Sequence, residues 1–175
     1  MKIVKADEFV DNVSQRIGEN LISHKVVVKK AGLSQREYEV VWITIEREAL
    51  IDTIKVMKNF DYPMLSVISS YDAGETVVLI YHFAIFRGVQ FATLHVELEV
   101  KVPKTDLWVP TITSEIPGAY VSEQEKREMI GIEVRGLRDM DNIFLPTDFP
   151  KDVYPWRKDE TGVDAKMPKR AGGEE

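Results

Sequence analysis

Two consecutive runs with the spacing of β-strands constrain the fold most strongly. From 91 to 102, apolar residues alternate strictly with polar ones, which is the period of a strand with one buried face and one wet face. From 76 to 86 the chain is apolar on both sides, as expected of a central strand covered on both faces. A turn at 87–88 separates the two runs. We therefore expect them to pair as an antiparallel hairpin.

Other patterns predict helices and strands before this hairpin. An apolar stripe repeats every four residues from 7 to 22, and residues 47–60 have a similar helical spacing. β-Branched and aromatic residues predict strands at 25–30, 38–45 and 64–71. The order α, β, β, α, β, β, β predicts an α/β two-layer domain with a mixed, partly antiparallel sheet packed by helices.

The region after the sheet is predicted to hold two helices and an extended C-terminal arm. Residues 111–116 indicate a short helix. Ser122 and Glu125 have the S-x-x-E spacing of a capping box, so a longer helix is expected to begin near Ser122. That helix is expected to run to Ile130, with Gly131 as the glycine that follows its last turn. The predicted units are an α/β domain (1–118), a helix with an extended docking arm (119–159) and a flexible tail (160–175).

Composition argues against several classes of function. The 175 residues are 44% hydrophobic and 30% charged, which is typical of one globular domain. The net charge of −6, without a dense Lys/Arg cluster, argues against nucleic acid as a partner. The absence of cysteine excludes disulfides, Fe–S ligation and thiol catalysis by this chain. Few Asn and Gln with many Glu and Lys favour a thermophilic source.

No segment has the length and apolarity expected of a membrane span. The longest nearly unbroken apolar run, 77–86, is far shorter than the roughly 18 residues that a spanning helix needs. The N-terminal residues lack the apolar core of a signal peptide. If the protein works at a membrane, we expect other proteins to hold it there.

The histidines and tryptophans give no complete reaction centre. His82 lies in the most apolar strand and is interpreted as a core histidine with satisfied partners. His95 and Glu97 share the wet face of their strand and supply at most two metal ligands. A solvated strand face is the favoured interpretation. A free-standing metalloenzyme and a ligand-binding module stay open as alternatives of another class. Trp42 is expected in the core, whereas Trp108 and Trp156 fit an interface or local packing equally well.

Three glutamates crowd the predicted helix. Acids are favourable in a first helical turn, which explains Glu123 and Glu125 locally. Glu128 lies near the helix end, where the helix dipole disfavours an acid, so an Arg or Lys partner in this chain or another is expected. Because nothing indicates a cleft that would separate their pKa values, we favour an interface or an internal salt bridge over catalysis. No phosphate-binding loop and no hydrolase elbow occurs.

An ordered set of motifs fills residues 119–159. It contains, in order, Glu123-Gln124-Glu125, Glu128, Met129-Ile130-Gly131-Ile132, Gly136, Ile143-Phe144-Leu145-Pro146, Asp148-Phe149 and Pro155-Trp156-Arg157-Lys158-Asp159. In this order the motifs resemble the thirty-kilodalton subunit family of respiratory complex I, the NuoC-like subunits, with relatives in membrane-bound NiFe hydrogenases. Strand and helix patterns at 38–72 and 79–83 look similar to the same family, so the resemblance covers about residues 38–159.

The chain departs from the family pattern at three places. Gln124 replaces an Arg, Leu137-Arg138 replaces His-Pro, and Asp141-Asn142 replaces an Arg pair, which reverses the local charge. These departures favour a hydrogenase or a related ferredoxin-dependent complex over a standard NADH dehydrogenase.

The resemblance implies a cofactor-free structural subunit in the peripheral arm of a membrane-bound redox complex, on the cytoplasmic side. It implies docking on a hydrogenase-large-subunit-like partner, with the NiFe centre and Fe–S clusters in that partner and other subunits, and with membrane subunits in the same complex. The favoured member is a hydrogenase that couples ferredoxin oxidation and H2 evolution to ion translocation. An NADH/quinone or sulfur-reducing complex is the alternative. The expected interface residues are Glu123, Glu125, Glu128, Gly131, Gly136, Ile143, Phe144, Leu145, Pro146, Asp148, Phe149, Trp156, Arg157 and Asp159.

Overall fold

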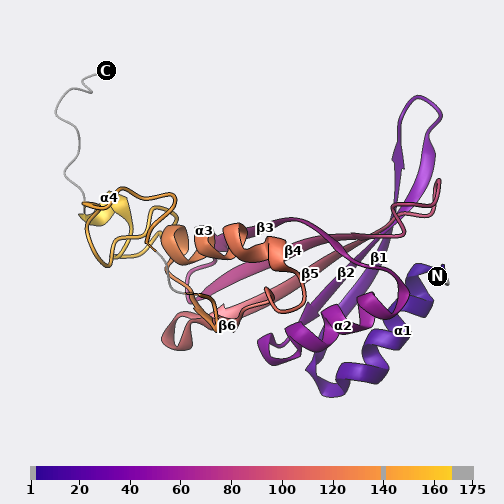
Figure 1. Ribbon diagram of the computed structural model, residues 1–175, viewed down its shortest axis with the longest axis horizontal. Helices are drawn as coiled ribbons and strands as arrows, with labels where there is room; N and C mark the ends of the chain where they lie inside the picture. Colours follow the sequence, from indigo (N-terminus) through magenta and orange to yellow (C-terminus); the bar gives the residue numbers. More distant parts are fainter. Residues whose placement is uncertain (1–2, 139–140, 167–175) are drawn as a thin grey trace.

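The core of the protein is a five-stranded mixed sheet with the strand order β1-β2-β5-β4-β3 (Figure 1). The computed structural model describes residues 3–138 and 141–166. β2 and β5 pair in parallel, and the other neighbouring strands are antiparallel. The strands are β1 (Leu21–Ala31), β2 (Arg36–Ile45), β3 (Met64–Asp72), β4 (Thr76–Ile85) and β5 (Leu94–Pro103), and a short parallel pair is formed by β6 (Trp108–Pro110) and β7 (Glu133–Arg135).

Helices α1 (Ala6–Ile17), α2 (Leu50–Phe60) and α3 (Tyr120–Ile130) pack on one face of this sheet. The short helix α4 (Val163–Lys166) lies apart from them, among the C-terminal loops (Figure 1). α1 and α2 bury Phe9, Leu50 and Met57 against inward-facing strand residues such as Leu79 and Leu98. On the other face, polar side chains of β4 and β5 are partly exposed. None of the helices in the described residues is both long and apolar enough to cross a membrane.

The predicted mixed sheet and its central hairpin are confirmed. β4 and β5 pair antiparallel over ten residues each, and β4 lies inside the sheet between β3 and β5. The first helix was predicted to run to residue 22, but it ends at Ile17. Gly18 there has φ +55°, and β1 already begins at Leu21. A left-handed glycine of this kind ends a helix without steric cost, and so the chain turns into a strand earlier than the apolar stripe suggested.

Two helix predictions after the sheet are wrong in detail. Residues 111–116 form turns, not a helix. α3 begins at Tyr120, directly after a 3-10 turn at 117–119, so Ser122 lies inside the helix and makes no capping bond. The end of the helix is as predicted, since Gly131 follows Ile130 with φ +71°.

The C-terminal part differs from the extended arm that was expected. Residues 141–162 form turns and bends that fold back on α3 and on the end of the sheet, which places this region at the opposite end of the molecule from the β1–β2 hairpin (Figure 1). Within the predicted tail, residues 160–166 include a bridge between Tyr154 and Gly162 and the helix α4. Residues 167–175 lie outside the described part of the chain.

Gly131 gives a direct test of this packing. A Cβ at Gly131 would lie 2.6 Å from a ring carbon of Tyr154, and the residue also has positive φ. We expect Gly131→Ala to lower the free energy of unfolding by about 2–4 kcal/mol, because backbone strain and a clash with a packed ring add. Gly74→Ala is the matched control, since Gly74 has positive φ but nothing within 4 Å of the added carbon. Equal losses in urea unfolding of the two variants would show that Tyr154 does not pack there.

Candidate docking site

Glu128 on α3 holds the following loop in place. Its carboxylate accepts the backbone N–H groups of Ile143, Phe144 and Leu145, each at 2.8 Å, and the side-chain amide of Gln124 at 2.7 Å. Burial alone raises the pKa of Glu128, but these four donors outweigh it and hold the pKa below its usual range. The expected cationic partner of Glu128 is therefore replaced by neutral hydrogen-bond donors, three of them backbone amides, which stabilise the charged carboxylate.

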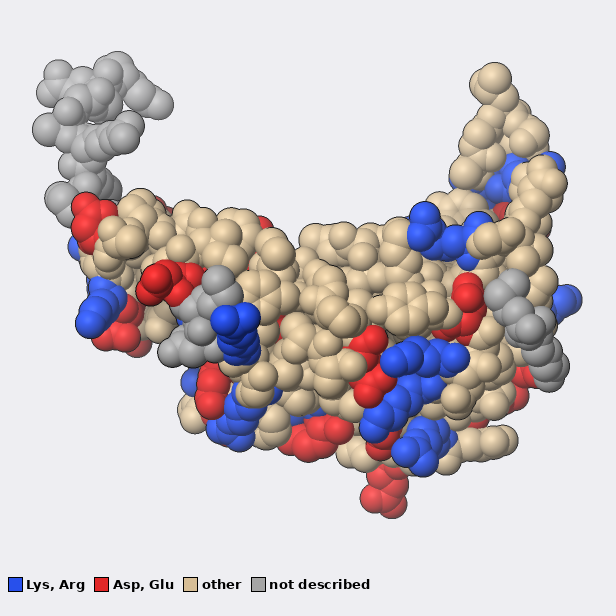
Figure 2. All heavy atoms as spheres, in the orientation of Figure 1, with Lys and Arg blue, Asp and Glu red and all other residues tan. Residues whose placement is uncertain are grey.

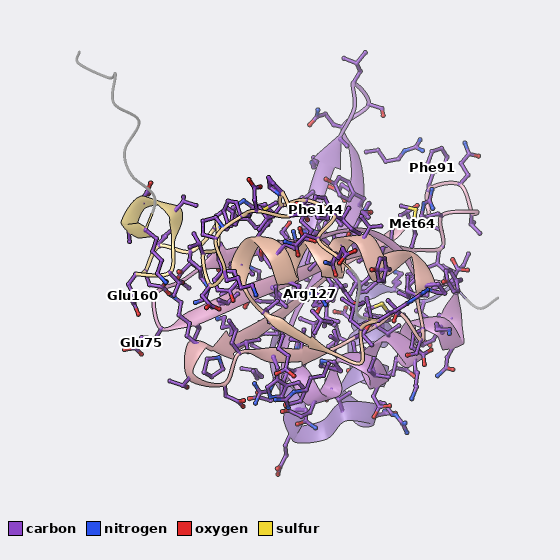
Figure 3. All side chains as sticks on the ribbon, turned by 60° about the vertical axis from the view of Figure 1, so that its left-hand side comes forward. Met64, Glu75, Phe91, Arg127, Phe144 and Glu160 are labelled. Atoms are coloured by element: carbon purple, nitrogen blue, oxygen red, sulfur yellow. The ribbon has the colours of Figure 1, made fainter. Side chains whose placement is uncertain are left out.

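The loop that Glu128 holds displays apolar side chains. Ile143 is 49% exposed and Phe144 is 39% exposed, and Figure 3 shows Phe144 above α3. Leu145 and Phe149 are half-buried, and they line a hollow of about 160 Å³ between the loop and α3. Residues 143–149 are called the docking loop from here on. Glu128 fixes the backbone of the loop, while Ile143 and Phe144 are exposed to solvent. Exposed apolar side chains on a fixed backbone are typical of a binding surface rather than of a core.

Glu123 fixes a second segment to the same helix. Its carboxylate accepts the Thr111 hydroxyl at 2.6 Å and the Ile112 backbone N–H at 2.7 Å. The side chain is fully buried, and burial raises the pKa of Glu123 to about 7 despite these two hydrogen bonds. The pKa of the nearby Tyr81 hydroxyl is also raised, mainly because the side chain is buried and to a smaller extent because of the charge of Glu123. Glu123 thus serves the interior of the fold and is not part of an exposed surface.

Ion pairs and hydrogen bonds attach the Pro-Trp-Arg-Lys-Asp motif, residues 155–159, to the end of the sheet. Asp72, the last residue of β3, accepts the Lys104 ammonium at 2.7 Å and the Lys158 backbone N–H at 2.9 Å. Lys104 also pairs with Asp159, whose carboxylate accepts Arg157 at 3.1 Å. Burial alone raises the pKa of both carboxylates. Hydrogen bonds from Lys104 and from backbone N–H groups hold the pKa of Asp72 below the usual range, and hydrogen bonds from Lys104 and Thr161 do the same for Asp159.

The same motif satisfies the end of α3. The backbone N–H of Trp156 donates to the Met129 carbonyl at 2.9 Å, and the Arg157 side chain donates to the Ile130 carbonyl at 2.6 Å. Carbonyl groups in the last turn of a helix lack partners within the helix, so these two bonds both cap α3 and anchor the motif. Arg157 and Asp159 therefore act on the surface indirectly, by placing Trp156.

Trp156 lies beside a hollow at the edge of the sheet. Its side chain is 39% exposed, and the Lys126 ammonium lies 4.5 Å from its ring centre while pairing with Glu125. A hollow of about 470 Å³ separates this group from Val67 and its neighbours on the edge strand β3. Exposed aromatic and apolar side chains next to a hollow are typical of a protein interface.

The predicted interface residues thus fall into two groups. The docking loop, Glu125 and Trp156 supply side chains that reach solvent. Other predicted residues stabilise the fold instead. Glu123 and Glu128 accept hydrogen bonds from backbone amides, and Arg157 and Asp159 attach the 155–159 motif to the sheet and to α3. Gly131 and Gly136 have positive φ in turns. The sequence patterns did not single out Asp72, Lys104 or Lys126, and Gln124 was named only as a departure from the family pattern. Only Asp72 had a readable signal, because Asp two residues before Gly74 is typical of a turn in which the side chain accepts the backbone N–H.

The other candidate residues do not assemble into a reaction centre. His82 binds Ser69 at 2.8 Å and pairs with Glu97, so it has the predicted partners, although it lies on the open sheet face. Within residues 3–138 and 141–166, no group of three or more His, Asp or Glu side chains is placed to hold a metal ion. Trp42 also lies on the open face, under Lys25, and not in the helix-covered core.

Trp108 is held by local packing. The guanidinium groups of Arg47 and Arg135 lie 4.3 and 4.0 Å from the centre of its ring. Of the two interpretations that the sequence left open for Trp108, the structure therefore favours local packing over an interface. Trp156 keeps its place at the exposed surface.

Comparison with known proteins identifies the family. A family model described as the 30 Kd subunit of respiratory-chain NADH dehydrogenase matches residues 43–166, and the chain belongs to this family. The membrane-bound hydrogenase subunit beta of Pyrococcus furiosus is 30% identical over 161 residues, which are 91% of each chain. Formate hydrogenlyase subunit 5 of Escherichia coli is 33% identical over 85 residues, which are 45% of this chain and 14% of that one.

A solved structure supports the fold. It is described as the membrane-bound sulfane sulfur reductase, an archaeal respiratory membrane complex. The matching chain has a TM-score of 0.65 at 17% identity, over 94% of this chain and 87% of that chain. At this identity the likeness shows a shared fold, and the predicted α/β architecture is confirmed.

Proposed function

We propose that this chain is a cofactor-free structural subunit in the peripheral arm of a multisubunit membrane-bound redox complex. It docks through the docking loop and Trp156 on a hydrogenase-large-subunit-like partner. The observation that carries the proposal is the Glu128 carboxylate, which fixes three consecutive amides and so presents Ile143 and Phe144 to solvent. A surface prepared in advance loses less conformational entropy on binding, which favours a stable subunit contact.

Three observations support a redox complex as the setting. The family model carries the name of a respiratory-chain subunit. The Pyrococcus furiosus relative, which has nearly the same extent as this chain, is named as a subunit of a membrane-bound hydrogenase. In formate hydrogenlyase subunit 5 the matching region is a small part of a much longer polypeptide, so a unit of this kind is covalently joined there to a larger one.

We place the chain in a hydrogenase that couples ferredoxin oxidation and H2 evolution to ion translocation, on the cytoplasmic side of the membrane. The NiFe centre and the Fe–S clusters then belong to partner subunits. The second candidate is the equivalent subunit of a sulfur-reducing complex, which the likeness to the chain in the sulfane sulfur reductase complex favours. In both settings this chain acts by holding the geometry of its partner, with no bond-making step of its own.

Loss of partner subunits after mutation tests the docking role. We expect Glu125→Ala combined with Phe149→Ala to lower the recovery of partner subunits at least fivefold when this chain is purified by a tag from its own cells. Both side chains are half-buried at the surface that we assign to the partner, so a folded chain should survive the change. The matched control is Glu99→Ala combined with Tyr71→Ala on the open sheet face. Full recovery of every partner with the first variant would refute the docking role.

A further inference from the structure

A second exposed surface lies at the end of the molecule opposite the docking loop. The β1–β2 hairpin projects from the sheet beside the loop 86–93 (Figure 1). Leu33 at its tip is fully exposed, and Phe91 in the neighbouring loop is 70% exposed. Figure 2 shows a hollowed upper outline between this hairpin and the body of the molecule. Residues 21–36 and 86–93 are called the hairpin surface below.

The hairpin surface encloses a hollow that can receive a side chain. The hollow has a volume of about 500 Å³, and its lining includes Arg36, Glu37, Tyr38, Phe91 and His95. Tyr38 and His95 form one wall, with ring centres 5.5 Å apart. The Arg36 guanidinium lies 3.4 Å from the centre of the Phe91 ring. Aromatic walls with one cationic group suit an apolar side chain next to a carboxylate.

The charge of the hairpin surface contrasts with the rest of the protein. Residues 21–36 and 86–93 include five Lys and Arg, namely Lys25, Lys29, Lys30, Arg36 and Arg87, and no Asp or Glu, in a chain with net charge −6. Glu37, which follows directly, is the one acid named above in the lining of the hollow. Lys30 pairs with Glu37. Within the part of the chain that the structure describes, no carboxylate forms an ion pair with Lys25, Lys29 or Arg36. Figure 2 shows blue side chains where the hairpin leaves the body.

We propose that the hairpin surface binds an acidic segment of a second protein subunit, which inserts a large apolar or aromatic side chain between Tyr38 and Phe91. Electrostatic complementarity selects the acidic partner, and the hollow sets its register. A protein segment fits better than an anionic membrane, because the surface is concave and its hollow has aromatic walls that suit a side chain. The chain then contacts two partners, one at each end of the molecule. This inference goes beyond the proposed function and rests on it only in treating the chain as a subunit of a complex.

Photo-crosslinking in the intact complex tests this proposal. A benzophenone amino acid is placed at Leu33 in one variant and at Phe149 in a second, and the purified complex is irradiated. At Leu33 we expect an adduct with a peptide of one partner subunit that is rich in Asp and Glu. The Phe149 adduct tests the docking loop separately, so failure of either surface is seen without reference to the other.

Charge reversal supplies the control. Adding Lys29→Glu and Arg36→Glu should reduce the Leu33 adduct at least fivefold. Lys55→Glu with Lys101→Glu, at comparably exposed positions elsewhere, should leave it unchanged. The proposal is overturned by any of four results: no protein adduct at Leu33, an adduct with lipid, an adduct with a basic peptide, or an adduct that persists after the charge reversal.

Discussion

Replacing Glu128 by alanine is expected to free the docking loop and to lower the free energy of unfolding by about 3–5 kcal/mol. The change leaves the N–H groups of Ile143, Phe144 and Leu145 without their acceptor, and each unsatisfied buried donor costs about 1–3 kcal/mol. Because Ile143 and Phe144 are partly exposed, water will satisfy some of these donors, which keeps the total below the sum of the maximum costs.

Urea unfolding and hydrogen exchange measure the two parts of this effect. Exchange at residues 143–145 should accelerate by at least tenfold in Glu128→Ala. The matched control is Glu133→Ala, whose exposed ion pair with Arg135 is worth less than about 1 kcal/mol. If exchange at 143–145 were the same in Glu128→Ala and in the unmodified protein, Glu128 would not be the support of the loop.

The second large effect concerns Glu123 and pH. The pKa of Glu123 is about 7 in the folded chain, against 4.5 without the fold. Between pH 4.5 and pH 7, the Glu123 carboxyl therefore keeps its proton in the folded state and has lost it in the unfolded state. Stability from this group is fully present below pH 4.5 and is lost as pH rises through 7. A shift of this size corresponds to roughly 3 kcal/mol.

Comparison with Glu123→Gln isolates this contribution. The amide keeps the shape of the protonated acid but cannot ionise, so the variant should lose less stability than the unmodified protein between pH 5 and pH 8. The difference in free energy of unfolding between the two proteins should thus shift by roughly 3 kcal/mol across that range. A difference that stays constant with pH would mean that Glu123 is already ionised in the folded chain at pH 5.

Much of the fold follows from periodicity, but the strand order does not. Alternation at 91–102 and the apolar run at 76–86 define a hairpin because both signals are local. The parallel pairing of β2 with β5 joins residues 55 positions apart, such as Val41 and Val96, and no local pattern encodes it. The false capping box has a local cause. Residues 117–119 already form a helical turn, so Ser122 has no free helix end to cap.

The motifs indicate a candidate site, whereas the roles of its residues depend on distant contacts. Glu128 was recognised as misplaced at a helix end, yet its partners are backbone amides, which every residue carries and which therefore leave no sequence signal. Asp72 and Lys158 are 86 residues apart. Gln124 stands where the resembling family has Arg, and its neutral amide donates to Glu128 in this chain.

Hydrogen exchange of this chain, alone and within its purified complex, tests the docking role most directly. We expect the peptide covering residues 143–149 to exchange at least tenfold more slowly in the complex, because a partner covers the docking loop. Strand β4, which is already buried, serves as the internal reference and should not change. Equal exchange of residues 143–149 in the free and the assembled chain would contradict the docking role.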